Sequence, residues 1–162
     1  MWIIKWFAII VALLLVLLVL AGQLGLLRGR PPGNLGINEG KLKRPSTTPN
    51  SVHSQADLWP DDVQREYAGI APLPLKGDGP ETIARLKTLL QAMPGVEIVD
   101  SRADYVYATC QTKLLKFIDD IELWYDREAG VVQVRSSSRI GRKDFGVNRT
   151  RVEALRAGLA GG

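Results

Sequence analysis

Residues 118–126, IDDIELWYD, and residues 131–138, VVQVRSSS, predict a hairpin of two antiparallel strands joined by a short turn. In both runs apolar and polar side chains alternate, which is typical of strands with one face against a core. If the residues between the two runs form the loop, Glu122 lies directly opposite Arg135. The hairpin should therefore present charged side chains on the face that points away from the core.

The rest of the domain is predicted from two further strand-like runs and two helices. The runs at residues 96–100 and 105–112 precede the hairpin. A helix over about residues 80–93 starts with acidic residues and a proline, and a second helix covers about residues 148–159. This order predicts an α+β domain, in which a four-stranded antiparallel meander is covered by two helices.

The first 28 residues have the composition of a transmembrane helix. From Trp6 to Gly22 no side chain is polar, and the apolar stretch continues to Leu27 with one interruption. As a helix it measures about 33 Å at roughly 1.5 Å per residue, which matches a hydrocarbon core of roughly 30 Å. We predict a single-pass protein of the bacterial inner membrane, anchored by residues 1–28, with residues 2–27 contacting the lipid bilayer. A signal peptide cleaved before Gly22 is the alternative.

The net charge of +4 is divided unevenly along the chain. Residues 1–44 hold six Lys/Arg and one Glu, whereas residues 45–162 hold fifteen Lys/Arg and sixteen Asp/Glu. The basic excess lies beside the apolar segment, where it would meet lipid headgroups, so nucleic-acid binding is not expected. Basic residues after the span favour a cytoplasmic domain, but the margin is small and the side of the membrane stays open.

Residues 29–49 are rich in glycine and proline and show little periodicity. Such a segment buries too little apolar surface to offset its ordering, so we expect an extended linker followed by the domain at residues 50–162. His53 lies in the polar start of that domain and is expected to be solvated. Cys110, the only cysteine, falls on an apolar strand face and is expected to be a buried free thiol.

A candidate site combines three carboxylates, three guanidinium groups and the start of the last helix: Asp119, Asp120, Glu122, Arg135, Arg139, Asn148 and Arg149. Arginines offer paired donors, and a helix start adds free N–H groups, so a phosphate or carboxylate ligand would fit. The structural alternative is that the acids pair with the arginines and Asn148 caps the helix. No metal is expected, because Asp119 points to the other sheet face and the arginines would repel a cation.

These residues also carry a resemblance to a known family. The pattern R-S-x-S-R-x-G-x-x-D-x-G-x-N-R-x-R runs from Arg135 to Arg151, and an acidic motif at residues 119–122 precedes it. In both features the chain resembles the bacterial and plastid domain-of-unknown-function family DUF1499, over roughly residues 45–160. The resemblance implies the fold and the boundaries of the domain, and it implies no established activity.

Two classes of function follow from these observations. The first is a membrane-tethered, non-catalytic module that binds a protein partner or a small anionic ligand, without a cofactor. The alternative is a hydrolase-type enzyme acting on an anionic substrate, with Asp119 or Asp120 as general base. The pairing of the carboxylates distinguishes the two, because an acid already paired with arginine is not available as a base, whereas an unpaired, desolvated one favours catalysis.

Overall fold

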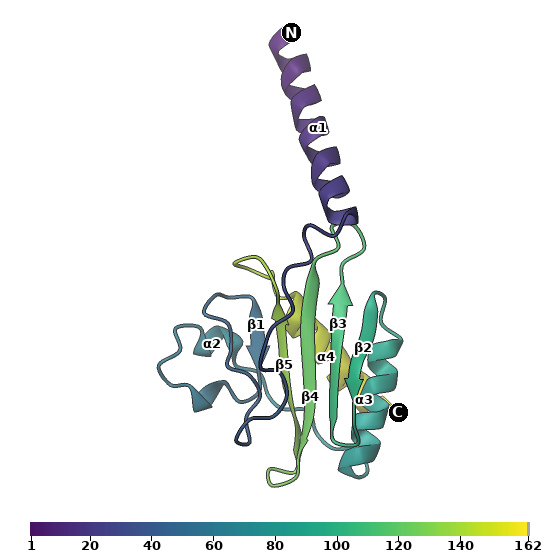
Figure 1. Ribbon diagram of the computed structural model, residues 1–162. Coiled ribbons are helices and arrows are strands. Elements are labelled where there is room, and N and C mark those ends of the chain that lie inside the picture. The colour runs from purple at the N-terminus through teal and green to yellow at the C-terminus, as the bar shows by residue number, and fades with distance from the viewer. Residues whose placement is uncertain (162) are drawn as a thin grey trace.

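In the computed structural model of the chain, a long helix projects from an α+β domain (Figure 1). The structure describes residues 1–161. The projecting helix, α1 (Trp2–Gln23), is the predicted apolar segment and has a mean hydropathy of 3.1 in its most apolar window. It is long and apolar enough to cross a membrane.

The domain is built on one antiparallel sheet of five strands in the order β1-β5-β4-β3-β2. The strands are β1 (Ser51–His53), β2 (Val96–Ser101), β3 (Tyr105–Gln111), β4 (Ile118–Asp126) and β5 (Val131–Ser138). The predicted register of the β4–β5 hairpin is confirmed, since Glu122 pairs with Arg135. The charged face of the hairpin follows directly from this register.

The predicted α+β fold is confirmed, and the sheet has one strand more than the predicted four-stranded meander. β1 adds to the free edge of β5, with Val52 opposite Ser136 and His53 opposite Arg135. Three residues are too few to show an alternating pattern, and the partner strand lies far away in the sequence. The expectation of a solvated His53 was wrong, because in β1 this side chain is fully buried.

Two helices, α3 (Gly79–Gln91) and α4 (Val147–Ala160), cover one face of the sheet (Figure 1). The side chain of Asp78 caps α3 by accepting the N–H of Glu81 at 2.7 Å. The core between these helices and the sheet is made of aliphatic side chains and the expected buried thiol, Cys110. Two short helices, η1 (Ala56–Leu58) and α2 (Arg65–Ala68), lie beside β1.

Part of the segment that follows α1 lies on the domain. Residues 29–45, which we call the strap, pass in front of β4 and β5 on the sheet face opposite α4 (Figure 1). Leu42 is only 2% exposed, and its N–H donates to Gln55 Oε1 at 3.0 Å. The N–H of Gly36 donates to the carboxylate of Glu122 at 2.7 Å. One buried leucine and backbone hydrogen bonds to buried side chains thus hold the strap on the domain.

The buried position of Leu42 predicts that the strap contributes to stability. Leu42→Ala should lower the free energy of unfolding by about 2–5 kcal/mol, the range for truncating a buried leucine. The neighbouring Lys41→Ala removes an exposed side chain and should change it by less than about 0.5 kcal/mol. Denaturant unfolding of the full chain in detergent measures both. Equal, small effects would mean that the strap is not bound to the domain.

Candidate functional site

The polar face of the sheet holds Glu122 and Arg135 as a buried ion pair. Arg135 Nη1 lies 3.3 Å from Glu122 Oε2, and the two side chains are 5% and 0% exposed. The hydroxyl of Tyr105 donates to Glu122 Oε1 at 2.8 Å, and Gly36 of the strap donates to the same oxygen. Burial lowers the pKa of Arg135, and the adjacent Glu122 opposes this shift. Both oxygens of Glu122 therefore have partners within the chain.

Asp120 and Arg139 form a tighter pair on the same face. Arg139 donates through Nε to Asp120 Oδ2 at 2.9 Å and through Nη2 to Asp120 Oδ1 at 2.8 Å. The hydroxyl of Tyr107 adds a third hydrogen bond to Asp120, at 2.6 Å. Hydrogen bonding to Asp120 raises the pKa of Arg139, and burial raises the pKa of Tyr107 to about 12. In this bidentate pair both carboxylate oxygens of Asp120 accept hydrogen bonds.

Asp119 points to the helix-covered face, as the alternation predicted, and pairs there with Arg151. The distance from Arg151 Nη2 to Asp119 Oδ2 is 2.7 Å. Through Nη1, Arg151 also donates to Asn148 Oδ1 at 2.7 Å and to Ser136 Oγ at 3.0 Å. Arg151 was in the sequence motif but not among the candidate site residues. Its spacing of three residues from Asn148, on the same side of the helix, is the signal that could have identified it.

Asn148 is fully buried at the centre of this network and does not cap α4 through its side chain. Its amide Nδ2 donates to Asn50 O at 3.1 Å, which holds the residue before β1 against the helix. The capping group is the carboxylate of Asp144, which accepts the N–H of Gly146 and the N–H of Asn148, each at 3.1 Å. The alternative in which Asn148 caps the helix is therefore wrong about the residue. The start of this helix is capped, but by Asp144.

Arg149 does not join the other predicted site residues. Its Nη2 donates to the carbonyl oxygens of Tyr67 at 2.6 Å and Gly69 at 3.0 Å. The predicted cluster thus divides into the polar-face pairs, the network around Asn148, and Arg149 of α4, which binds carbonyl groups at the end of α2.

His53 is a buried polar residue that links β1 to the strap. Its Nδ1 accepts the N–H of Gln55 at 2.9 Å, and its Nε2 lies 3.0 Å from the carbonyl oxygen of Lys43. Burial, with a smaller effect of Arg135, lowers the pKa of His53 to about 3. The ring is therefore neutral, with Nε2 as the donor to Lys43.

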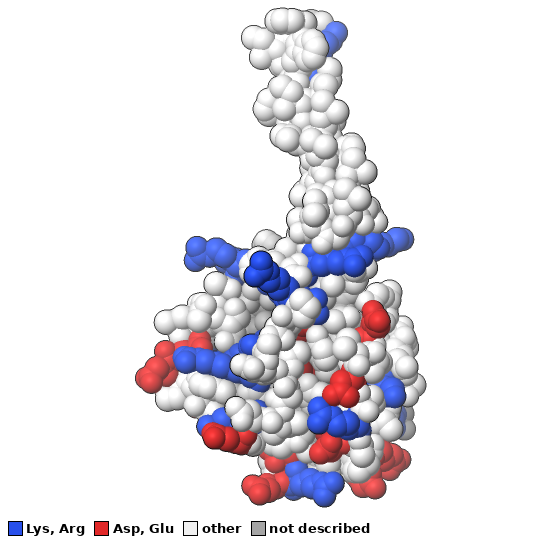
Figure 2. Space-filling view, viewed as in Figure 1, with Lys and Arg blue, Asp and Glu red and all other residues white. Residues whose placement is uncertain are grey.

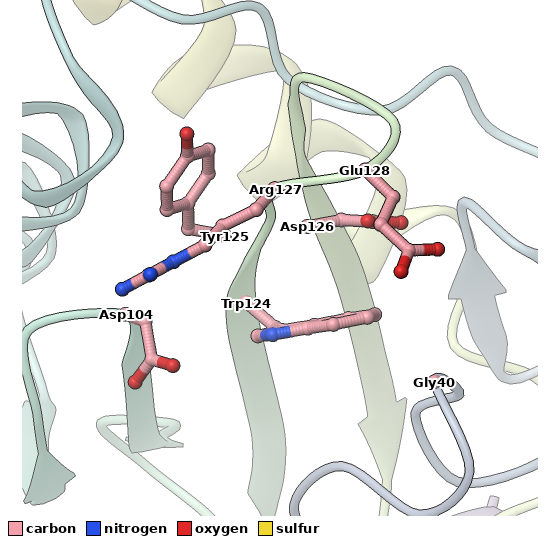
Figure 3. Close-up of a pocket in the computed structure, with 7 residues that line it drawn as sticks. All are labelled: Gly40, Asp104, Trp124, Tyr125, Asp126, Arg127 and Glu128. Atoms are coloured by element: carbon pink, nitrogen blue, oxygen red, sulfur yellow. The ribbon is translucent and has the colours of Figure 1, made fainter.

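Two cavities lie near opposite ends of the sheet, and Asp119 of the Asp119–Arg151 pair lines the larger of these two. One, of about 350 Å³, surrounds Trp124 at the end of the sheet distant from α1. Figure 3 shows the indole below the carboxylates of Asp126 and Glu128, with Arg127 extending toward Asp104. The other, of about 430 Å³, lies between the β3–β4 loop and the loop before α4. Within residues 1–161, no group of three or more His, Cys, Asp and Glu side chains is placed to hold a metal ion.

Comparison with protein families identifies the domain. A family model described as "Protein of unknown function (DUF1499)" matches residues 41–159, which is more than half of the chain. The chain belongs to the DUF1499 family. The matched DUF1499 region begins within the strap, shortly before Leu42, and includes both ion-pair networks. Comparisons with curated proteins and with solved structures found no significant match.

The lowered pKa of His53 predicts acid sensitivity of the DUF1499 domain. A histidine with a folded-state pKa of about 3 binds fewer protons than in the unfolded chain, so its contribution to stability is complete above about pH 6.5 and decreases as the pH falls toward 3. The free energy of unfolding should therefore fall more steeply below about pH 6.5 in the wild type than in His53→Gln. The carboxyl groups with lowered pKa, Asp62 and Asp144, act in the same direction in both proteins.

Denaturant unfolding of both full-length proteins at a series of pH values measures the two slopes. Equal slopes would show that His53 titrates normally and is not buried as a neutral ring.

Proposed function

We propose that this chain is a membrane-tethered, non-catalytic interaction module. The tether is α1, whose most apolar residues are not covered by any other described part of the chain. A helix of this length and hydropathy that has no protein surface to cover it is stable in a lipid bilayer. Retention of the helix, as opposed to cleavage, is supported by its contacts with the domain. Gln23 Nε2 donates to Leu114 O at 2.9 Å, and Gly22 lies so close to the Leu115 backbone that a Cβ at position 22 would be 2.6 Å from Leu115 O.

The observation that carries the non-catalytic part of the proposal is the pairing of all three candidate acids. A general base must accept a proton from a substrate, and it needs a free lone pair within hydrogen-bonding reach of that proton. Asp120 is bound at both oxygens, by two nitrogens of Arg139 and by Tyr107, and Asp119 is bound at Oδ2 by Arg151. Accepting a proton at either acid would leave a largely buried arginine side chain without its counter-charge, which is costly. This geometry argues against the hydrolase alternative.

The same pairs argue against a small anion bound at the predicted arginines. Arg135 and Arg139 are already neutralised by Glu122 and Asp120, with side chains no more than 8% exposed. An incoming phosphate would have to displace a carboxylate that is held by several hydrogen bonds. Binding through exposed surfaces of the domain is therefore favoured over binding inside the charged cluster.

The proposed tether predicts that the chain remains in the membrane with its N-terminus intact. After alkaline carbonate washing it should stay in the membrane pellet, with the mass of the complete chain, 17.8 kDa. Leu13→Arg combined with Val16→Arg should release it, because each arginine at the helix centre costs about 2.5–3.5 kcal/mol of insertion free energy. The matched Leu13→Ile, Val16→Ile variant should remain in the pellet. A soluble wild-type chain shortened at its N-terminus would show that the segment is a cleaved signal peptide.

A further inference from the structure

Basic side chains gather at the end of the domain that adjoins α1 (Figure 2). They come from three separate parts of the sequence: the residues just after α1, the β3–β4 loop at residues 112–117, and the loop at residues 140–146 before α4. We call these residues and loops the collar, and its basic members are Arg28, Arg30, Lys113, Lys116, Arg142 and Lys143. The acidic side chains visible in Figure 2 lie farther from α1.

The positive charge of the collar is not neutralised within the described chain. None of its six basic residues takes part in the ion pairs found among residues 1–161. The one acid in the two loops, Asp144, is 8% exposed and is occupied by Tyr67 and by the start of α4. The collar therefore presents a surface of one sign.

The position of the collar is determined by its contact with the anchor. The hydrogen bond from Gln23 to Leu114 O, at 2.9 Å, and the packing of Gly22 on Leu115 join the β3–β4 loop to the last turn of α1. A span of about 33 Å ends at the headgroup region of the bilayer. If α1 crosses the membrane, the collar must lie at that depth.

The collar also exposes large apolar side chains among its charges. Phe145 is 93% exposed and Leu114 is 60% exposed. Phe145 has a φ of 53°, a left-handed conformation that is unusual for a bulky residue. Beside it lies the cavity of about 430 Å³, whose apolar lining includes Phe117, Ile140 and Val147. Basic residues interspersed with exposed aromatic and aliphatic side chains are typical of protein surfaces that enter the membrane interface.

We propose that the collar binds the anionic lipid surface of the bilayer that α1 spans. The lysines and arginines contact lipid phosphates, while Phe145 and Leu114 enter the boundary between headgroups and acyl chains. This second attachment holds the domain against the membrane instead of leaving it free below the anchor. The inference rests on the proposed membrane tether, and an anionic lipid is favoured over an acidic protein because the contact with α1 places the collar at the headgroups.

Amide hydrogen exchange of the full chain in lipid nanodiscs tests the proposal. Discs of phosphatidylcholine alone are compared with discs that also contain phosphatidylglycerol. The wild type should exchange at least about threefold more slowly in residues 112–117 and 140–146 when the anionic lipid is present, since each basic residue near an anionic surface adds to the attraction. Exchange in α3, away from the collar, should be the same in both discs.

Two variants test which side chains are responsible. The fourfold reversal Lys113→Glu, Lys116→Glu, Arg142→Glu, Lys143→Glu should abolish the difference between the discs. A reversal of four basic residues outside the collar should preserve it: Arg65→Glu, Arg85→Glu, Lys87→Glu and Arg127→Glu. Phe145→Ala with Leu114→Ala, which alters only exposed side chains, should reduce the protection without affecting exchange in the core strands.

The outcomes separate the collar from the tether. If the chain enters the discs but exchanges equally with both lipids, the collar does not bind anionic lipid and the collar proposal is overturned. This result leaves the membrane tether supported. A chain that does not enter the discs overturns both. Protection that survives the collar reversal also contradicts the proposal, since it would come from another surface.

Discussion

The ion pair between Asp120 and Arg139 is the interaction on which the polar face of the sheet depends. A charge removed from water needs a partner of opposite sign and enough hydrogen bonds to compensate for lost hydration. Asp120 obtains both from one guanidinium and one tyrosine hydroxyl. The neighbouring Glu122–Arg135 pair is looser, at 3.3 Å, and Arg135 Nε has no hydrogen-bond partner among the described residues. The bidentate Asp120–Arg139 pair is therefore the more tightly bound of the two pairs on this face.

The strap explains how a sheet face with so many charges can be buried. Gly36 donates its N–H to Glu122, and Lys43 accepts a hydrogen bond from the neutral ring of His53. These contacts place backbone over the charged side chains and exclude water from them. Because only residues 24–28 separate the strap from α1, the polar face, the collar and the membrane anchor form one connected unit. In our proposal this connection determines how the domain is oriented at the membrane.

The sequence predicted those parts of the structure that are encoded locally. Alternation in residues 118–138 was sufficient for the β4–β5 register, and Asp78 with the following proline marked the start of α3. The parts that were missed depend on contacts between distant residues. β1 is three residues long and is defined by pairing with β5, and the strap is buried through single hydrogen bonds that no periodicity reveals. The candidate site shows the same division, since the pairing of Glu122 with Arg135 was predictable but the network of Asn148, Asp144 and Asn50 was not.

The central claim is that the charged cluster is structural, and a double-mutant cycle on Asp120 and Arg139 tests it most directly. The free energy of unfolding is measured for the wild type, Asp120→Ala, Arg139→Ala and the double variant, each as the full chain in detergent. We expect each single substitution to cost about 3–5 kcal/mol, because it leaves a buried charge unpaired, and the double variant to cost clearly less than the sum. Single substitutions that leave stability unchanged or increase it would contradict the claim and would indicate groups retained for chemistry at the expense of stability.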